Sequence, residues 1–269
     1  MKSIENDQEG VSGVSNHGRD ARLEYICQSI ARGRFVSFRE ITERFDVNIQ
    51  TARRDVMLLV SQNKLTKVHG GAISREDQDI LSVEARLSVR DTEKRHIAEM
   101  AAGLISDGDV IFLDGGSTTA FLAPLLRGRA IHVVTNAISL MQTLKMGWPD
   151  LDVIVTGGYY YPKSELLLGP SAVESLKNLQ INKAFLSAAG VTADGVFNTN
   201  MLVVDLERAV IGQAMETYLL ADSSKLERTS LVRVCGLEAI STLITTGPVP
   251  VSIATAAASV NCHISSYAG

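Results

Sequence analysis

Side chains able to read DNA bases stand together near residue 50. Gln50, Thr51, Arg53 and Arg54 fall within five positions of a segment whose apolar residues have helical spacing. The donors of an Arg side chain match the O6 and N7 atoms of guanine in pairs, and a Gln amide matches N6 and N7 of adenine. Side chains in the first turns of a helix can enter the major groove of B-DNA. These four residues therefore predict a base-reading helix.

A second group of polar residues follows the strands predicted in the rest of the chain. The run Asp-Gly-Gly-Ser-Thr-Thr at 114–119 offers backbone amides, three hydroxyls and a helix start, which together can hold an anion. Thr135 and Asn136 end the next strand, and two glycines at 157–158 follow the one after. Lys225 follows the last strand and supplies an ammonium group for a phosphate. No nucleotide-binding motif is present in this region.

Two helices joined by a tight turn would position the base-reading residues. Ser37 and Glu40 have the spacing of a capping box, which predicts a short helix. Asn48 is a good N-cap for a following helix over 49–62. The apolar face of that helix, expected to pack on its neighbours, consists of Ile49, Ala52, Val56 and Leu59. The segment is typical of a helix-turn-helix at about residues 36–55.

An earlier helix and a basic hairpin complete this small unit. Residues 20–32 carry apolar residues at helical spacing. Residues 63–68 alternate polar and apolar before a His-Gly-Gly-Ala turn at 69–72, which predicts a wing that places Lys67 and His69 against DNA. The alternative is a plain three-helix bundle with a solvated basic face.

Alternating helices and buried strands predict a parallel sheet for the larger unit. The expected helices cover 93–105 and 119–127, and the tail at 247–269 is either disordered or an added strand. The expected strands are 110–113, 131–135, 153–156, 184–188 and 217–221. Ligands of open α/β sheets bind beyond the carboxyl ends of the strands, where the second polar group lies.

Composition fits a cytoplasmic protein that binds nucleic acid. Residues 19–75 hold eleven Lys and Arg against six Asp and Glu, whereas the whole chain has a net charge of −4. No apolar run reaches the length needed to cross a bilayer. Three separated cysteines argue against a disulfide framework, and five scattered histidines argue against a metal site. The polar segment 1–18 is interpreted as a disordered leader.

The first unit resembles the DeoR family of bacterial regulators. The carrying string is VNIQTARRDVMLLVSQNKLTKVHGGA, in which Thr51, Arg53, Arg54 and Asp55 match the family's recognition helix in register. Asn48 stands where Ser is usual, and Ala52 where Ile or Val is usual. The residues predicted to contact DNA are Ser37, Asn48, Gln50, Thr51, Arg53, Arg54, Lys67 and His69.

The larger unit resembles the sensor domain of the same family over residues 76–246. The matching pieces include LDGGSTT at 113–119, VTN at 134–136 and LADSSK at 220–225. The resemblance implies a fold like ribose-5-phosphate isomerase and CoA-transferases, with a phosphorylated sugar as effector. Lys94 is the exception among the candidates, since a solvated helix position explains it equally well. The predicted effector site consists of Lys94, Asp114, Gly115, Gly116, Ser117, Thr118, Thr119, Thr135, Asn136, Gly157, Gly158 and Lys225.

These observations predict an α/β repressor of carbohydrate catabolism genes that acts as a homodimer or homotetramer on double-stranded operator DNA. The expected order is a winged helix-turn-helix at 19–75, a linker at 76–92, a sensor at 93–246 and a tail of unknown role. No cofactor is expected. A sugar-phosphate isomerase is the rival, but no motif marks Glu165 or Glu207 as its base. An architectural DNA binder would leave the acidic α/β unit unexplained.

Overall fold

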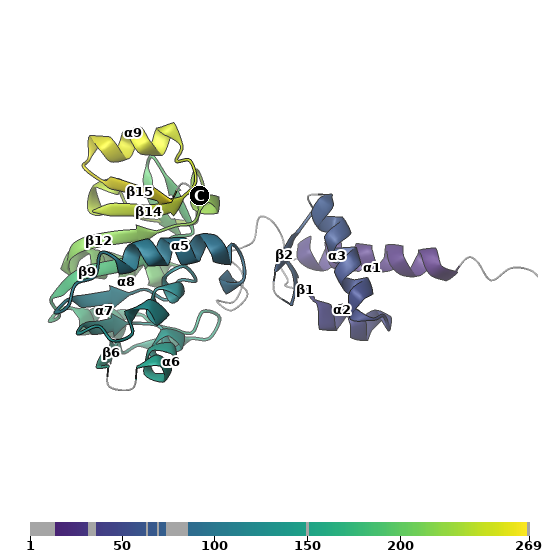
Figure 1. Ribbon diagram of the computed structural model, residues 1–269, viewed down its shortest axis with the longest axis horizontal. Coiled ribbons are helices and arrows are strands. Elements are labelled where there is room, and N and C mark those ends of the chain that lie inside the picture. The colour runs from purple at the N-terminus through teal and green to yellow at the C-terminus, as the bar shows by residue number, and fades with distance from the viewer. Residues whose placement is uncertain are drawn as a thin grey trace, which may run out of the picture. The chain divides into compact units, whose positions relative to one another are not determined.

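The computed structural model divides the chain into two compact units, Met1–Leu81 and Ser82–Gly269. It describes residues 14–31, 36–62, 64–68, 70–73, 86–148 and 151–267. Among these residues no helix is both long and apolar enough to span a membrane. Figure 1 shows the helices and strands of each unit.

Three helices and a small antiparallel sheet form the first unit. The helices are α1 (Val14–Ala31), α2 (Phe38–Phe45) and α3 (Ile49–Ser61). Strands β1 (Val36–Ser37), β2 (Thr66–Val68) and β3 (Gly71–Ile73) pair in the order β1-β3-β2. Gly70 makes the turn before β3 with a φ of 80°, and its carbonyl accepts from the Phe38 amide at 2.7 Å. This is the helix-turn-helix with a wing that the sequence predicted.

Two expectations for this unit were wrong in detail. Residues 14–18 were expected in a disordered leader, but α1 already begins at Val14. The apolar spacing starts only at Leu23, so the earlier turns carry no pattern that marks them as helical. Ile49 was expected to pack inward but remains 47% exposed. It is the first residue of α3, where the chain has only begun to approach the core.

A buried ion pair fastens α1 to α3. Asp55 is buried, and its Oδ2 accepts from Nε of Arg22 at 2.7 Å, while Nε of the half-exposed Arg19 lies 3.4 Å from Oδ1. Ile26, Val56 and Leu59 form the apolar core beside this pair. Asp55 therefore has a packing role, although it belongs to the same run as the base-reading arginines.

The second unit is built on a seven-stranded sheet in which every pairing is parallel. The strand order is β15-β14-β12-β9-β4-β5-β6. Figure 1 labels β15, β14, β12, β9 and β6 of this sheet. The strands are β4 (Val110–Leu113), β5 (His132–Thr135), β6 (Val153–Val155), β9 (Ile181–Ser187), β12 (Ala214–Leu220), β14 (Thr242–Thr246) and β15 (His263–Tyr267). Because the strands are parallel, all their carboxyl ends lie along one edge.

Helices and small sheets surround this sheet. Helix α5 packs on β12 and β14, and α8 packs on β9 and β12. The α-helices are α5 (Asp91–Ala102), α6 (Ile138–Gly147), α7 (Pro170–Leu176), α8 (Met201–Gln213) and α9 (Val251–Ser259). The hairpin strands are β7 (Tyr159–Tyr161) with β8 (Leu166–Leu168), and β10 (Gly190–Thr192) and β11 (Gly195–Asn198) with β13 (Val232–Cys235). Short 3₁₀ turns are η1 (Thr119–Phe121), η2 (Ala123–Leu126), η3 (Ser223–Lys225) and η4 (Leu237–Ala239).

Three further expectations are corrected here. The helix expected at 119–127 is the pair of 3₁₀ turns η1 and η2, because Pro124 lacks the N–H that an α-helix through this position would need. Residues 86–92 were expected in the linker, but Val89 is buried and α5 begins at Asp91. Helix α5 ends at Ala102 rather than at 105, with Gly103 as its C-cap.

The tail is an added strand, one of the two alternatives that the sequence left open. Strand β15 pairs with β14 from Thr242–His263 to Thr246–Tyr267. The Tyr267 ring stacks on His96 of α5 with 4.0 Å between the ring centroids. Helix α9 and β15 thus extend the sheet beyond the region where the sequence resembled the sensor domain.

Replacing Asp55 with Ala should destabilise the first unit by about 3–5 kcal/mol, because it leaves the buried Arg22 charge without its partner. Arg39→Ala is the control, since its ion pair with Glu43 is exposed to solvent and its loss should change stability little. Calorimetry on the full chain measures both variants. Equal, small losses in the two variants would contradict a packing role for Asp55.

Candidate DNA interface and effector site

The predicted base-reading side chains lie on the exposed side of α3. Gln50, Arg53 and Arg54 are exposed, and Met57 on the same side is 49% exposed. The buried side of the helix carries Ala52, Val56 and Leu59. The Arg53 guanidinium lies 5.8 Å from the centroid of the Phe38 ring, a cation–π contact that ties it to the start of α2. The helix therefore presents three donor side chains to solvent.

Two predicted DNA contacts have structural duties at helix starts. The side chain of Asn48 caps α3, accepting from the Thr51 amide at 2.9 Å and from the Thr51 hydroxyl at 3.2 Å. The Ser37 hydroxyl caps α2 by accepting from the Glu40 amide at 2.9 Å. Both caps have the geometry that the sequence predicted. Among the residues that the structure describes, the Ser37 hydroxyl donates to none.

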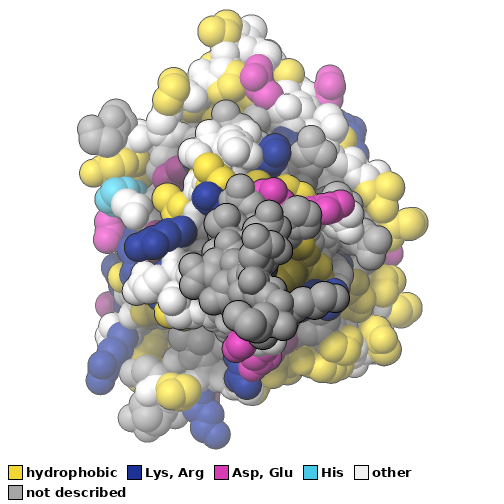
Figure 2. Space-filling view, turned by 90° about the vertical axis from the view of Figure 1, so that its right-hand side faces the viewer, with side chains coloured by type: hydrophobic (Ala, Val, Ile, Leu, Met, Phe, Trp, Pro, Cys, Tyr) yellow, Lys and Arg dark blue, Asp and Glu magenta, His cyan; other side chains and the backbone are white. Residues whose placement is uncertain are grey.

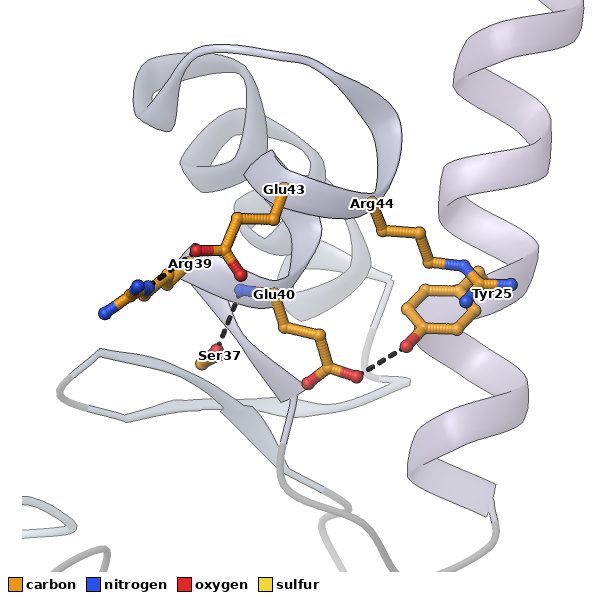
Figure 3. Close-up of a pocket in the computed structure, with 6 residues that line it drawn as sticks. All are labelled: Tyr25, Ser37, Arg39, Glu40, Glu43 and Arg44. Atoms are coloured by element: carbon orange, nitrogen blue, oxygen red, sulfur yellow. Dashed lines mark hydrogen bonds and ion pairs between the residues drawn. The ribbon is translucent and has the colours of Figure 1, made fainter.

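A shallow groove between α1 and α2 carries paired charges (Figure 3). The Tyr25 hydroxyl donates to Glu40 at 2.5 Å, and the Arg44 guanidinium lies 4.3 Å from the centroid of the Tyr25 ring. Arg39 pairs with Glu43 at 2.7 Å. Because two arginines stand against two glutamates, the groove has no net charge to attract an anion. Its contacts hold α2 against α1.

The wing contributes one exposed predicted contact. Lys67 on β2 is exposed, whereas His69 lies outside the described residues. Figure 2 shows Lys and Arg side chains scattered among acidic, hydrophobic and other side chains on the coloured part of one face.

Two glycines let the loop after β4 approach its neighbours closely. A methyl group added at Gly115 would lie 2.1 Å from Cδ2 of Leu166, and one at Gly116 would lie 1.9 Å from Oγ of Ser187. A larger residue at either position would force the loop away from β8 or β9. The sequence predicted these glycines as part of the site, and here they bring the loop against the ends of adjacent elements.

The hydroxyls near this loop fall into two kinds. The Thr119 hydroxyl donates to the carbonyls of Asp114 and Gly116 at 2.6 and 2.8 Å, and the Thr135 hydroxyl donates to Leu113 O at 2.7 Å. These two hydroxyls already use their hydrogens to shape the strand ends. Ser117 and Thr118 are buried, and their hydroxyls donate to no residue in the described part of the chain.

The ends of β5 and β6 carry polar groups without partners. Asn136 is fully buried, and neither its amide nitrogen nor its amide oxygen has a hydrogen-bond partner among the described residues. The buried Thr156 hydroxyl likewise has no hydrogen-bond partner among the described residues. Gly157 beside it is exposed, and Gly158 has a φ of 127° that brings its backbone to the Leu168 carbonyl. Unpaired polar groups are costly in an interior, so these side chains mark a place for a ligand or water.

Asp114 is a buried carboxyl at the end of the central strand β4. Its Oδ2 accepts from the Ser187 hydroxyl at 2.7 Å. Burial raises the pKa of Asp114, while the Ser187 hydrogen bonds and the charge of Arg86 oppose the rise. Arg86 therefore lies within electrostatic reach of this carboxyl.

Lys94 is buried on α5 rather than solvated. Its Nζ donates to the carbonyl of Arg86 at 2.5 Å. Burial lowers the pKa of Lys94 to about 8, with Asp222 opposing the shift and the positive charges of Lys225 and Arg86 adding to it. Lys94 thus shares one neighbourhood with Lys225, as the predicted effector site required.

The turn η3 holds Lys225 and is anchored to α5. The Asp222 side chain caps η3 by accepting from the Ser224 amide at 3.0 Å. Glu93 accepts from the Ser223 hydroxyl at 2.8 Å, from Thr246 at 2.7 Å and from Arg90. The position of Lys225, which is half-buried, is therefore fixed by groups on three elements.

Both units match models of one protein family. Residues 22–78 match DeoR-like helix-turn-helix domains, and residues 89–246 match the DeoR C-terminal sensor domain. This chain belongs to the DeoR family. As a DeoR-family member with an intact helix-turn-helix, it is a DNA-binding transcriptional regulator.

Relatives of this DeoR-family regulator include activators and repressors by name. The L-fucose operon activator of Haemophilus influenzae is 34% identical over 85% of this chain and 92% of that protein. The lactose phosphotransferase system repressor of Streptococcus mutans is 30% identical over 84% of this chain and 92% of that protein. The glycerol-3-phosphate regulon repressor of Escherichia coli is 28% identical over 85% and 91%.

Among solved structures, ribose 5-phosphate isomerase A of Methanocaldococcus jannaschii is similar to this chain. The similarity covers 51% of this chain and 54% of the isomerase chain. Its sequence identity is 21% and its TM-score 0.37. The translation initiation factor eIF-2B of Pyrococcus horikoshii is similar over 83% of this chain and 77% of that chain, with a sequence identity of 16% and a TM-score of 0.41.

Sequence reasoning missed several groups around the sensor strands. Ser187 is the last residue of β9, and Thr156 directly follows β6. The predicted effector residues also lie at strand ends, so this position in the sequence could have pointed to Ser187 and Thr156. Arg86 lies in a segment interpreted as linker, so no pattern pointed to it. Glu207 was considered only as a catalytic base, yet it is buried and within electrostatic reach of Asp114.

The pKa of Lys94 has a consequence for stability. Below pH 8 both the folded and the unfolded chain hold the Lys94 proton. Between pH 8 and 10.5 only the unfolded chain holds it, so the free energy of unfolding rises with pH. Lys94→Met should remove a rise of about 3 kcal/mol over this window. Urea unfolding at several pH values measures it, with the exposed Lys145→Met as control. Parallel pH curves for wild type and Lys94→Met would contradict the buried ammonium.

Proposed function

We propose that this DeoR-family regulator represses genes of carbohydrate catabolism and releases or tightens on its operator when a phosphorylated sugar binds the sensor unit. The observation that carries the DNA half is the exposed face of α3, where Gln50, Arg53 and Arg54 point donors to solvent. Ser37, Asn48 and Thr51 order the helix starts, and Lys67 on the wing contacts the DNA backbone, as does His69, which lies outside the described residues.

The regulator acts as a homodimer or homotetramer. One recognition helix contacts too few base pairs to find a site in a genome, and a two-fold pair of helices matches two half-sites about one DNA turn apart. Sedimentation in the presence of DNA tests this. A monomer at working concentrations, with and without DNA, would exclude the paired arrangement.

The effector is a sugar phosphate held at the carboxyl edge of the sheet. Lys225, the amides of Gly115 and Gly116, and the Ser117 and Thr118 hydroxyls would hold the phosphate. Asp114 would accept from sugar hydroxyls, with Asn136 and the backbone of Gly157 and Gly158 on the other side. The Thr119 and Thr135 hydroxyls keep the strand ends in shape.

Lys94 connects this site with the chain segment that leads to the DNA-binding unit. Its ammonium group binds the Arg86 carbonyl, and Arg86 is close in sequence to the Leu81–Ser82 boundary. A phosphate that forms an ion pair with the Lys94 ammonium group would weaken the hydrogen bond between Lys94 and the Arg86 carbonyl. A ligand shifts DNA affinity only by its preference between two arrangements, typically about 1–3 kcal/mol.

Catalysis is not part of the proposed function. The base of an isomerase must be ionised at working pH. Burial and the charge of Asp114 raise the pKa of Glu207 well above its ordinary value, which favours its neutral form. Glu165 lies in the turn between β7 and β8 with a φ of 55°. Sensing in the cytoplasm, without a cofactor, fits these groups better than proton abstraction.

Arg53→Ala should lose about 1–3 kcal/mol of operator affinity and accept more bases at one position, because a bidentate base contact is removed. Lys67→Ala should weaken binding to all sequences and reduce the slope of log affinity against log salt by about 0.9. Fluorescence anisotropy at several salt concentrations measures both. An Arg53→Ala protein with unchanged base preference would show that Arg53 contacts phosphate only.

Lys225→Ala should leave DNA affinity unchanged and abolish the response to a sugar phosphate, because it removes the phosphate's counter-charge. Lys177→Ala is the control, since Lys177 is exposed and pairs with Glu174. Calorimetry against sugars and their phosphates, together with DNA binding, measures the effect. A preference for unphosphorylated sugars, or an equal loss of DNA binding in Lys225→Ala, would show that the pocket is misassigned.

A further inference from the structure

One buried carboxyl group near Asp114 is only half satisfied. Glu207 lies on the buried side of α8 and is 2% exposed. Its Oε1 accepts from the Asn198 amide at 2.8 Å, which joins α8 to β11. Its Oε2 is fully buried and has no hydrogen-bond partner among the described residues. A buried polar atom left without a partner lowers the stability of the folded chain.

A structural role alone does not account for this arrangement. The bond to Asn198 would hold α8 against β11 with one oxygen, and an apolar or amide side chain would avoid burying a second carboxyl beside Asp114. The two acids lie close enough for the charge of Asp114 to raise the pKa of Glu207. Asp114 stands at the carboxyl edge of the sheet, where the proposed ligand binds.

The hydrogen bonds decide which oxygen carries the proton. Oε1 accepts an N–H from Asn198, so the hydrogen of a neutral Glu207 sits on Oε2. The unpartnered atom is then a donor. Asp114 is held by the Ser187 hydroxyl and still has acceptor capacity. A donor and an acceptor within electrostatic reach of each other match a pair of neighbouring hydroxyls, each of which can both accept and donate.

We propose that Glu207 determines the specificity of the effector site by donating from Oε2 to a hydroxyl of the sugar, with Asp114 accepting from the next one. The proposal rests on the proposed function, because the ligand is the same sugar phosphate. The phosphate is bound by Lys225 and the glycine loop, while Glu207 reads the polyhydroxy part.

Calorimetry on the full chain tests this with inorganic phosphate, ribose 5-phosphate, glucose 6-phosphate and 2-deoxyglucose 6-phosphate. Glu207→Gln keeps one acceptor and one donor, so it should bind each sugar phosphate within about threefold of wild type. Glu207→Met has a similar shape without polar atoms and should lose at least tenfold for the preferred sugar phosphate. A site built to bind a hydroxyl discriminates strongly when the partner group is missing.

Inorganic phosphate should bind Glu207→Met and wild type within twofold, since the phosphate is held by Lys225 and the glycine loop and not by Glu207. Glu207→Asp withdraws the carboxyl by one methylene and should lose sugar affinity like Glu207→Met, so it decides the matter if the Met variant does not fold. Asp205→Asn on the exposed side of the same helix is the control.

Full sugar-phosphate affinity in Glu207→Met or Glu207→Asp would overturn the role of Glu207. A wild-type protein that binds none of the three sugar phosphates better than inorganic phosphate would instead overturn the proposed function. The two failures are therefore distinguishable in one set of titrations.

Discussion

Lys94, Asp114 and Glu207 are each more than nine-tenths buried, and a charge withdrawn from water is costly unless other groups compensate for it. All three belong to the region around the carboxyl edge of one parallel sheet. The surrounding structure supplies part of the compensation, through the Arg86 carbonyl, the Ser187 hydroxyl and the Asn198 amide. Among the described residues, the Asn136 amide, the Thr156 hydroxyl and Oε2 of Glu207 still have no hydrogen-bond partner, which is the physical basis for placing a ligand there.

The same constraint acts in the DNA-binding unit with the opposite result. Asp55 is buried, but Arg22 satisfies it, so this carboxylate closes a packing contact and leaves nothing for a ligand. Its neighbours Arg53 and Arg54 are both exposed, and Arg53 in addition lies over the Phe38 ring at the start of α2. The run Arg53–Asp55 thus has two parts. Asp55 is buried and holds α3 against α1, whereas Arg53 and Arg54 are exposed to solvent.

The sequence predicted those features that depend on nearby residues. The caps at Ser37 and Asn48, the glycine loop after β4 and five of the parallel strands, β4, β5, β6, β9 and β12, follow from local patterns. It failed where distant segments decide. Asp114 and Ser187 are 73 residues apart, so their hydrogen bond has no local signal. Lys94 seemed equally suited to solvent because the segment that covers it was taken for a linker, and the unpatterned start of α1 was taken for a leader.

The central claim is that the sheet edge and the DNA-reading helix are linked through binding free energy, and reciprocity tests it most directly. Operator DNA selected from random duplexes is titrated with and without saturating sugar phosphate, and the sugar phosphate is titrated with and without that DNA. The account predicts that both affinities change by the same factor, typically about 5–150. Affinities that are unchanged in both titrations would contradict it.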